Sequence, residues 1–459
     1  MSQNENITPV ATCDPVLRWP RLPSGQDAQV LVLGSQLEQS QWFDAERLEK
    51  LQLHQLHSLL LHAHDHVEWY AKSLGNLALD RGVPLDPETW QTIPVLLRSH
   101  VQDADNRLHA GRVPLPYKHS GESISSGSTG QPVKTIKSAV DQVFFLANNL
   151  RFFKWANWNF SKTVANITPS NAKTKELAKS GQPTAWAPGH VSGPMYYFPV
   201  SKTTVEKIEW LERIKPTYLI IFPSALDDIV RVLDEEGKTL PTLRGIMSQS
   251  EMLDDRIRQS CEDKFGVRFF EIYSTQEIGV IAVQCPEHAH YHVMSESVMV
   301  EILDEDDQPC ETGKMGRVVV TSLHNFNMPL IRYDTGDYAI KGDPCDCGRG
   351  LPVISQICGR FRNLFVNPQG QRFWPTIGGT GNLFSLGKFR RMQFIQHAIN
   401  ELEVKLVADH ELDGDQEISI KQQLINHFWP EMIVTITYVD DLPRSPSGKF
   451  EDFMCLVAD

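Results

Sequence analysis

The fold is decided by residues 217–273, which read TYLIIFPSALDDIVRVLDEEGKTLPTLRGIMSQSEMLDDRIRQSCEDKFGVRFFEIY. Short apolar runs in this stretch predict three buried strands, at 217–222, 243–248 and 267–273. The segments between them have the length and the terminating glycine of helices, at 225–235 and 254–265. Strands that alternate with helices of this size indicate a parallel sheet, whose ligand lies at the carboxyl ends of the strands. We therefore expect a binding site near 248–251 and 273–277.

The pattern changes on both sides of this stretch. Upstream, Asp44 is a suitable N-cap for a long amphipathic helix that ends near Ser73. Downstream, strands of an antiparallel or barrel type are expected at 317–322 and 330–333, and an α+β lobe after Cys358. We predict an α/β fold whose large N-terminal domain combines parallel βαβ sheets with a small barrel-like part, followed by a small mobile α+β domain. The predicted boundaries are a poorly specified arm at 1–43, the large domain at 44–358 and the C-terminal domain at 359–459.

The composition narrows the class of protein. The chain has 459 residues, of which 41% are apolar and 22% charged, so it can bury a sizeable core. Its net charge of -13 argues against nucleic acid or an anionic membrane surface as the main partner. No apolar run approaches the roughly 18 residues of a membrane-spanning helix, and the first residues lack a secretory pattern. Eight cysteines are too few for a disulfide scaffold, so we expect a cytoplasmic enzyme.

A loop rich in glycine and hydroxyl groups stands between an expected strand at 122–124 and an expected helix from Ser138. It reads SSGSTGQP at 125–132, and its N–H groups and hydroxyls could wrap a phosphate. Gly130 is followed by Gln-Pro rather than Lys-Ser or Lys-Thr, so this is not the P-loop pattern. Taken alone, such a loop is most often just a flexible connection.

Three further motifs follow in order. They are YSTQE at 273–277, RYDTGD at 332–337 and LPRSPSGK at 442–449. Each alone would be a turn with solvated charges. Together with the loop at 125–132, they resemble the adenylate-forming superfamily of acyl-CoA synthetases, luciferases and adenylation domains. The tighter resemblance, which includes PQGQRFWP at 368–375, is to the phenylacetate-CoA ligase-like branch with its capsular-polysaccharide-associated relatives.

The resemblance implies that a carboxylic acid attacks the α-phosphate of ATP and expels pyrophosphate, which yields an acyl-AMP. Lys449 would bridge the attacking carboxylate and the phosphate, and Glu277 would bind Mg²⁺. Asp337 would hold the ribose hydroxyls with help from Arg360. The implied ATP- and AMP-binding set is completed by Ser125, Ser126, Gly127, Ser128, Thr129 and Gly130 at the phosphates, and by Ser250, Glu251, Tyr273, Ser274 and Thr275 around the adenine.

A second half-reaction is also implied, in which a thiol, in the first place CoA, takes the acyl group. The small domain would rotate about a hinge after Gly359 and Arg360 to remove Lys449. The chain has Arg362 and Asn363 where the family carries its usual hinge residue, so an acyl carrier protein or an amine are alternative acceptors. A degenerate, non-catalytic nucleotide-binding protein is the alternative from another class. Members of this branch often form dimers, which makes a homodimer a further expectation.

Two cysteine-containing segments suggest a metal site. Cys345 and Cys347 form a tight knuckle, and two thiolates together with one cysteine and one histidine from another segment complete a tetrahedral structural Zn²⁺ site. Cys285 and His292 are the expected partners, because their spacing resembles that of zinc-carrying members of the branch. His290 is the alternative histidine, and reduced cysteines without a metal are the alternative interpretation.

The acid pocket has weaker signals. Aromatic residues between the phosphate loop and the parallel sheet could hold an aryl acid, although such residues more often belong to a core. Tyr197 is one of them, and Gly189 and His190 lie where the family gates its acyl site. We therefore predict a pocket that involves Gly189, His190 and Tyr197 and takes an aryl or small acid.

Overall fold

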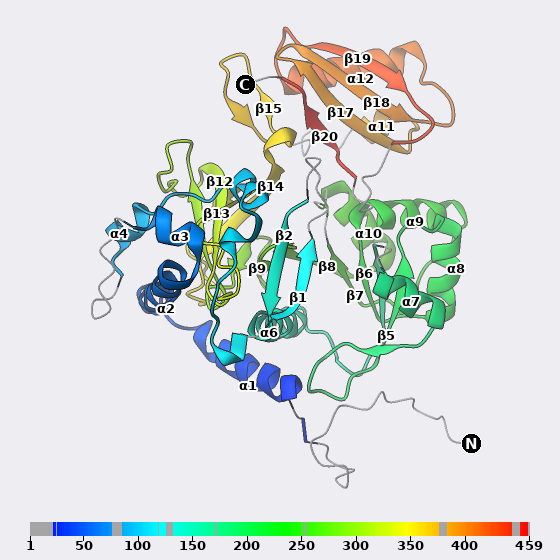
Figure 1. Cartoon of the computed structure of the whole chain (residues 1–459). Helices are drawn as coiled ribbons and strands as arrows, with labels where there is room; N and C mark the ends of the chain where they lie inside the picture. Colours follow the sequence, from blue (N-terminus) through cyan, green and yellow to red (C-terminus); the bar gives the residue numbers. More distant parts are fainter. Residues whose placement is uncertain are drawn as a thin grey trace, which may run out of the picture.

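The computed structural model describes residues 22–23, 25–75, 85–117, 119–124, 132–169, 172–249, 251, 253, 255–375, 383–442 and 450–457. A large α/β domain carries a smaller lobe formed by the last part of the chain (Figure 1). The helices and 3₁₀ turns of the large domain are α1 (Gly25–Ser40), α2 (Ala45–His66), α3 (Glu68–Ser73), α4 (Pro87–Gln91), α5 (Arg98–Asp103), η1 (Asp105–Leu108), η2 (Leu115–Tyr117), α6 (Ala139–Trp155), α7 (Ala172–Ser180), α8 (Thr204–Ile214), α9 (Pro223–Glu235) and α10 (Asp255–Phe265).

One long sheet runs through the large domain. In spatial order its strands are β11, β12, β13, β14, β10, β9, β8, β7, β6, β3, β5 and β4, and a separate hairpin consists of β1 and β2. The bounds of these strands are β1 (His119–Ile124), β2 (Lys134–Ser138), β3 (Val164–Thr168), β4 (Thr184–Ala185), β5 (Pro194–Pro199), β6 (Tyr218–Ile221), β7 (Gly245–Ser248), β8 (Arg268–Thr275), β9 (Gly279–Gln284), β10 (Tyr291–Val293), β11 (Val298–Leu303), β12 (Met315–Ser322), β13 (Tyr333–Lys341) and β14 (Val353–Arg360).

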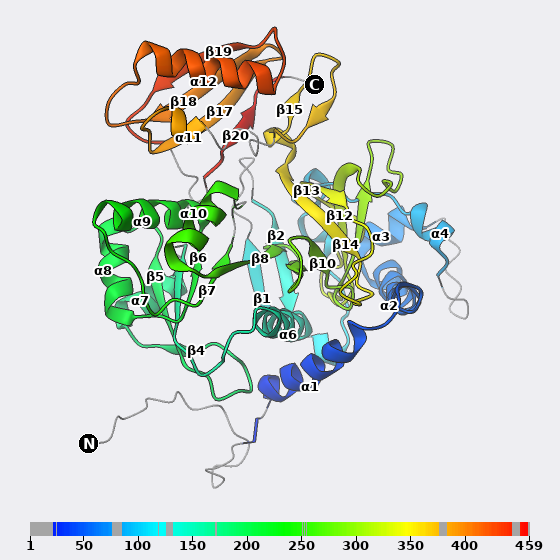
Figure 2. The ribbon, with the colours of Figure 1, turned by 180° about the vertical axis from the view of Figure 1, so that it is seen from behind.

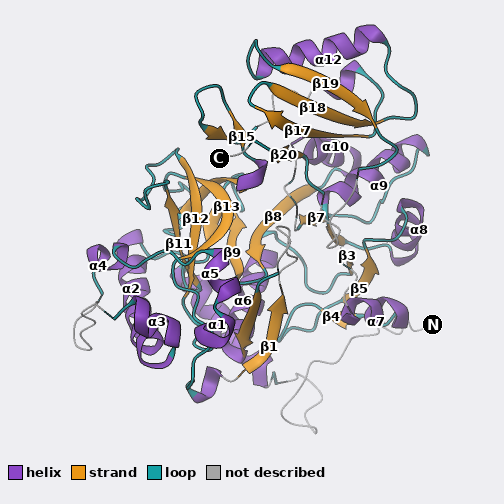
Figure 3. Ribbon diagram, turned by 45° about the horizontal axis from the view of Figure 1, so that its top comes forward, coloured by secondary structure: helices purple, strands orange, loops and turns teal. Residues whose placement is uncertain are grey.

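The parallel half of this sheet is the part that the sequence predicted best. Strands β5, β3, β6, β7 and β8 pair in parallel. Helices α8, α9 and α10 cover one face, where Leu211, Leu226 and Ile257 pack on the strands (Figure 3). Helix α6 covers the other face through Leu150, and α1 lies beside α6 and contributes Val30 to the same core (Figure 2). Both faces are therefore buried, which explains why the strands read as continuous apolar runs.

The antiparallel half begins where β9 turns back along β8. Within the described residues, strands β9 to β14 pair with one another only in antiparallel fashion and enclose a core that contains Ile281, Val318 and Ile354. The α/β fold with a barrel-like part is thus confirmed. The strand predicted at 330–333 was misplaced, because β13 starts only at Tyr333 and Arg332 has a positive φ of 48° that interrupts extended backbone.

Two N-terminal elements differ from the prediction. Residues Gly25–Ser40 of the expected arm form α1, which packs its buried Val30 and Leu37 against α6. The single helix expected from Asp44 to Ser73 is broken at Val67, whose extended backbone forms an isolated bridge with Ala110. Asp44 does cap α2, since its side chain accepts the N–H of Arg47 at 2.8 Å.

The smaller lobe has its own sheet and core. Its elements are η3 (Phe361–Asn363), β15 (Phe365–Val366), β16 (Arg372–Phe373), α11 (Leu383–Leu386), β17 (Arg391–Ala398), β18 (Glu401–Val407), α12 (Gly414–His427), β19 (Ile433–Tyr438) and β20 (Phe453–Cys455). The sheet has the order β19, β18, β17, β20, and α12 covers it through Ile420 and Leu424, which pack on Phe394 and Val404. Figures 1 and 2 place this lobe above α9 and α10 of the large domain.

Candidate active site

The carboxyl ends of the parallel strands gather the acidic side chains of the candidate site. Strands β6, β7 and β8 pair in parallel, so their carboxyl ends lie at one edge of the sheet. Glu251 follows β7, and Glu277 follows β8. An edge of this kind is where open α/β sheets bind ligands. Of the sequence-predicted set, the structure brings Glu251, Tyr273, Glu277, Asp337 and Arg360 to this region.

The buried carboxylate of Asp337 on β13 is held by groups from two other strands. The Tyr273 hydroxyl on β8 donates to Asp337 Oδ2 at 2.8 Å, and Arg360 Nε on β14 lies 3.5 Å from Asp337 Oδ1. Burial, together with the charge of Asp337, raises the pKa of Tyr273 well above its usual value, so the phenol keeps its proton and donates. A carboxylate fixed from two sides retains lone pairs that suit a pair of neighbouring sugar hydroxyls.

Glu277 lies among cationic groups. Its side chain is 7% exposed, and its Oε1 is 2.8 Å from Arg98 Nη1. The same guanidinium nitrogen lies 3.4 Å from the Tyr333 hydroxyl. Lys137 donates a hydrogen bond to the main-chain carbonyl of Glu277. A hard carboxylate oxygen suits a divalent cation, and the two positive side chains nearby suit a polyphosphate.

The hairpin of β1 and β2 lies against the turn that carries Glu277. Ser123 Oγ donates to Gln276 Oε1 at 3.1 Å, and Lys137 on β2 reaches the Glu277 carbonyl. The loop that joins the two strands contains the predicted phosphate-binding residues. Ser125, Ser126, Gly127, Ser128, Thr129 and Gly130 lie outside the described residues, as do Ser250 and Lys449.

Glu251 connects the large domain to the C-terminal lobe. Its Oε2 accepts the N–H of Ser224 at 3.0 Å in the first turn of α9, where a negative charge is favourable. Its Oε1 accepts the N–H of Phe450 at 2.7 Å, and Phe450 directly follows Lys449 in the sequence. A second contact between the lobes is the ion pair of Asp228 on α9 with Arg391 on β17.

Thr275 and Ser274 lie at the end of their own strand, and the two residues of the expected hinge contact residues at or near β20. Thr275 Oγ1 accepts the N–H of Ile278 at 3.2 Å and so closes the turn after β8. Ser274 is exposed at the end of the same strand. At the expected hinge, Arg362 pairs with Glu451, and Asn363 Nδ2 donates to the carbonyl of Phe453.

The predicted acid-pocket residues are not all brought together. Gly189 and His190 precede β5 and therefore lie at the amino ends of the parallel strands, opposite to the edge that carries Glu277. A Cβ atom at Gly189 would lie 2.4 Å from the Leu31 side chain of α1, and the His190 ring centroid lies 4.6 Å from that of Phe160. Gly189 thus packs against α1, and His190 packs against Phe160. Tyr197, in contrast, lies toward the carboxyl end of β5.

Two cations of this region were missed by sequence reasoning. Arg98 is 179 positions away from Glu277, and no motif links the two. Lys137 belongs to a polar strand, KTIKS, that resembles a loop in the sequence. Burial lowers the pKa of Lys137, although the carboxylates of Asp141 and Glu277 oppose this effect. Ile136 is the only apolar residue of β2, so no alternation of polar and apolar residues in the sequence indicates this strand.

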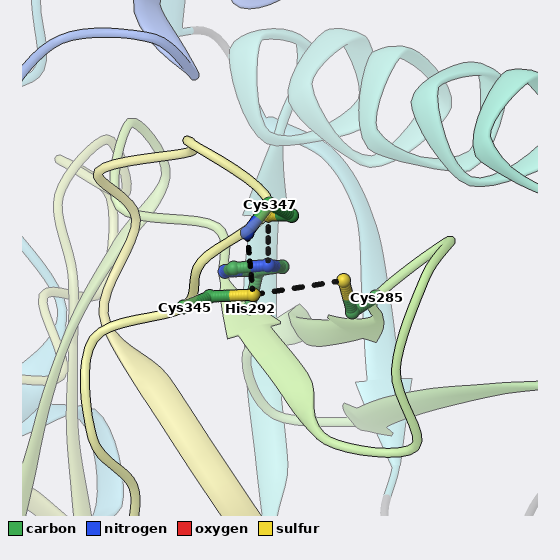
Figure 4. Close-up of side chains that lie close together, drawn as sticks. All are labelled: Cys285, His292, Cys345 and Cys347. Atoms are coloured by element: carbon green, nitrogen blue, oxygen red, sulfur yellow. Dashed lines mark hydrogen bonds between the residues drawn. The ribbon is translucent and has the colours of Figure 1, made fainter.

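A second cluster contains three cysteines and one histidine. The candidate ligand atoms of Cys285, His292, Cys345 and Cys347 all lie within 4.8 Å of one another, and Figure 4 shows them directed toward a common centre. The sulfur atoms of Cys285 and Cys345 are 4.0 Å apart, and Cys347 Sγ lies 3.4 Å from His292 Nε2. A tetrahedral site with zinc–sulfur bonds of about 2.3 Å requires similar separations, so the donor set fits zinc. His290 is not part of this group.

Adjacent strands explain why the four ligands meet. Cys285 follows β9 and His292 lies on β10, while Cys345 and Cys347 occupy the connection between β13 and β14, and β10 pairs with β14. His292 Nδ1 lies 3.3 Å from the Leu351 carbonyl, which orients the ring. Burial lowers the pKa of His292 to about 4, so the imidazole is neutral and able to bind a metal at neutral pH.

None of the helices in the described part of the chain is long and apolar enough to cross a membrane.

The sequence matches two protein-family profiles. The profile described as AMP-binding enzyme covers residues 125–328, and the CapK C-terminal domain covers residues 385–454. Among curated relatives, the phenylacetate-coenzyme A ligase of Thermus thermophilus is 24% identical over 340 residues, which span 72% of this chain and 74% of the relative. The phenylacetate-coenzyme A ligase of Pseudomonas putida is 25% identical over 182 residues, or 38% of this chain and 40% of the relative.

Solved structures share the fold. A 2-hydroxyisobutyryl-CoA ligase in the postadenylation state, in complex with 2-HIB-AMP, has a TM-score of 0.71 at 16% identity, covering 91% of this chain and 90% of its own. The same ligase in the thioesterification state has a TM-score of 0.59 with 90% and 91% coverage. An anthranilate CoA ligase in complex with anthranoyl-AMP has a TM-score of 0.56 at 15% identity and covers 73% of this chain and 66% of its own.

Proposed function

The chain belongs to the adenylate-forming, phenylacetate-CoA ligase-like AMP-binding enzymes, and from this premise we propose that it activates a carboxylic acid with ATP and transfers the acyl group to CoA. The carboxylate oxygen attacks the α-phosphorus, a new oxygen–phosphorus bond forms, and the bond to pyrophosphate breaks. The products of this step are an acyl-AMP and pyrophosphate. Catalysis then consists of placing two anions in contact and stabilising the charge on the phosphoryl oxygens.

The residues at the carboxyl edge are assigned to parts of the nucleotide. Asp337, fixed by Tyr273 and Arg360, accepts hydrogen bonds from the ribose hydroxyls. Glu251 lies beside the adenine, together with Ser250, Ser274 and Thr275, and residues 125–130 hold the phosphates. Glu277 is the residue that would hold Mg²⁺, which when bound neutralises the charge of the polyphosphate. Arg98 pairs with this carboxylate, and Lys137 donates a hydrogen bond to the main-chain carbonyl of the same residue.

Lys449 is proposed as the catalytic cation between the carboxylate of the acid and the α-phosphate. As a compact point charge, it stabilises charge that develops in the transition state. The proposed domain boundary lies at 358/359, with the hinge after Arg360, so that the lobe at 359–459 carries Lys449 to and from the edge.

The thiol step follows after the lobe has moved. The sulfur of CoA attacks the acyl carbonyl, a carbon–sulfur bond forms, and the bond to AMP breaks. The acid is proposed to be an aryl or small acid held near Tyr197, and a carrier protein or an amine are the alternative acceptors. We also propose that Cys285, His292, Cys345 and Cys347 hold a structural Zn²⁺, because four protein ligands leave no open position for chemistry.

The hydrogen bond between Glu251 and Phe450 is the strongest support for the proposal. Glu251 at the sheet edge accepts the N–H of Phe450, the residue that follows Lys449. The segment of the C-terminal lobe that carries the proposed catalytic cation is therefore joined by a hydrogen bond to the edge where Glu277 and Asp337 lie. A degenerate nucleotide-binding protein would have no need for this connection.

Exchange of labelled pyrophosphate into ATP tests the first step. Across a panel of aryl and small carboxylic acids, at least one acid is expected to support exchange. Lys449→Ala is expected to reduce this exchange by about a hundredfold or more, which is the typical cost of removing one group that stabilises the transition state. The control is Lys421→Ala, which removes the same charge from the exposed face of α12 in the same lobe.

Two results of this experiment would contradict the proposal. If no acid of the panel supports exchange, a degenerate protein is favoured. If Lys449→Ala exchanges as fast as the natural chain, Lys449 is not the catalytic cation. Mass spectrometry of products formed with CoA, with carrier proteins and with amines identifies the acceptor, and we expect the CoA thioester.

A further inference from the structure

Lys137 connects two elements that the proposed reaction needs together. It lies on β2, opposite Gly121 of β1, and is the last residue before the N-cap of α6. Its ammonium crosses to the turn after β8 and donates to the main-chain carbonyl of Glu277. One side chain thus joins the β1–β2 hairpin, the start of α6 and the turn that carries Glu277.

The neighbours of Lys137 hold it in this position. Ser138 and Asp141 form a reciprocal cap at the start of α6, with the Asp141 carboxylate accepting the Ser138 N–H at 2.7 Å. Asn325 Nδ2 donates to the carbonyl of Ile136 at 2.8 Å and so fixes β2 from the opposite side. The stem of Lys137 is therefore attached to rigid backbone, and only its ammonium extends toward the Glu277 turn.

Arg98 and Lys137 act on different parts of Glu277. Arg98 binds the carboxylate, at 2.8 Å, whereas Lys137 binds the main chain of the same residue. A cation on the carboxylate competes with any other ligand of that carboxylate. A cation on the carbonyl fixes the residue and leaves the carboxylate oxygens available. Arg98 must therefore release the carboxylate when a ligand binds to it, whereas Lys137 can keep its hydrogen bond.

We propose that Lys137 is a positioning residue for adenylation, which keeps the Glu277 carboxylate oriented toward Mg²⁺·ATP by anchoring its main chain to the β1–β2 hairpin. The inference rests on the proposed function, because it assigns the metal-bound nucleotide as the ligand of Glu277. It predicts that loss of the ammonium weakens the metal-dependent part of nucleotide binding. A purely structural hydrogen bond would instead lower the stability of the protein and leave that part unchanged.

The test compares three full-length variants with the natural chain. Lys137→Met removes the ammonium and keeps the length of the stem, and Lys137→Arg keeps a charged donor. Lys134→Met is the matched control, because Lys134 lies on the same strand and pairs with Glu122 at 2.8 Å with both side chains largely exposed. Calorimetry measures the affinity for ATP with Mg²⁺ and, in parallel, with EDTA.

The expected result is a selective loss. Lys137→Met should bind Mg²⁺·ATP up to about ten- to a hundredfold more weakly, a limit reached when ligand binding must restore all the order that this one charge-assisted hydrogen bond supplies in the free protein, with affinity in EDTA unchanged. Lys137→Arg should recover most of the affinity, and Lys134→Met should match the natural chain. In the exchange assay, KM for ATP should rise for Lys137→Met while KM for the acid stays constant.

Other results would overturn the inference. Equal loss of affinity with Mg²⁺ and with EDTA, or no loss at all, contradicts a positioning role, and so does a failure of Lys137→Arg to bind better than Lys137→Met. The calorimetry does not depend on turnover. If the natural chain binds Mg²⁺·ATP but no acid supports exchange, the proposed function fails while the comparison of the lysine variants still decides this inference.

Discussion

The cysteine–histidine cluster and the candidate nucleotide site are built in opposite ways. The cluster takes three side chains from two neighbouring connections of one antiparallel sheet and the fourth, His292, from strand β10, and the four ligand atoms all lie within 4.8 Å of one another. The nucleotide site takes residues from β8, β13, β14, the β1–β2 hairpin and the C-terminal lobe. A group that only holds the fold together is best assembled within one rigid unit. A site that must bind, react and release is divided between units that can move apart.

The first prediction tests whether the cysteine–histidine cluster holds a metal that stabilises the fold. The double variant Cys345→Ser and Cys347→Ser removes two ligands and is expected to lose the metal and about 4 kcal/mol or more of stability, the range reached when a structural metal is lost. At about 2–4 °C per kcal/mol for a large domain, the melting temperature should fall by roughly 8 °C or more. Elemental analysis after washing with a chelator and calorimetric melting measure the two effects.

The control for this prediction is Cys455→Ser in the smaller lobe, where the thiol donates to Gln396 and lies far from the cluster in the sequence. It should keep its metal and its melting temperature. Less than about half an equivalent of zinc in the natural chain would contradict the proposed structural site, whatever the variants do.

The second prediction concerns the contact between the lobes. Asp228 on α9 pairs with Arg391 on β17, and both side chains are mostly buried, at 16% and 14% exposure. Asp228→Asn removes an attraction that exists only while the lobes have this arrangement. We expect pyrophosphate exchange to fall about five- to thirtyfold, which corresponds to about 1–2 kcal/mol. Thioester formation from a supplied acyl-AMP should not fall, because that step uses another arrangement.

A neighbouring residue of the same helix provides the control. Asp234 also lies on α9 but pairs with Lys264 inside the large domain. Asp234→Asn should leave both half-reactions unchanged. If Asp228→Asn slows both half-reactions equally, the ion pair serves general stability and not the choice between lobe arrangements.

The two sites also differ in how well the sequence predicted them. The knuckle of Cys345 and Cys347 is local, and a spacing of two residues restricts the chemistry strongly enough to suggest a metal. The parallel strands were equally accessible, since β6, β7 and β8 are buried on both faces and read as apolar runs. Here local sequence and tertiary environment agree.

The failures occur where the decisive contact is distant in the sequence. Arg98 pairs with Glu277, and α1 is anchored by a hydrogen bond from Arg151 to the carbonyl of Leu37, so neither feature has a local signal. The pocket role of Gly189 and His190 stays a prediction from their place in the family pattern, and the structure places both residues at the amino ends of the parallel strands. Sequence order alone does not give the end of a sheet at which a loop lies.

The third and smallest prediction tests whether the scaffold between the two sites is sensitive to pH. His324 stacks on Phe144 of α6 at 3.9 Å between ring centroids, and its Nε2 lies 2.7 Å from the Glu296 carbonyl. Burial lowers the pKa of His324 below its usual value of about 6.5. The unfolded chain therefore binds this proton more readily than the folded one, so the stability contribution is present above the unfolded pKa and is lost as the pH falls below it.

The loss of stability is small, because only one proton is involved. Between pH 7.5 and 5.5, protonation of a single histidine in the unfolded chain can cost at most about 1.4 kcal/mol. His324→Gln keeps a polar group next to the Glu296 carbonyl and removes the titration, so its urea-unfolding free energy should decline less than that of the natural chain over this range. The difference between the two slopes isolates His324 from other buried histidines, which titrate equally in both proteins. Parallel curves would show that the ring takes up its proton without cost.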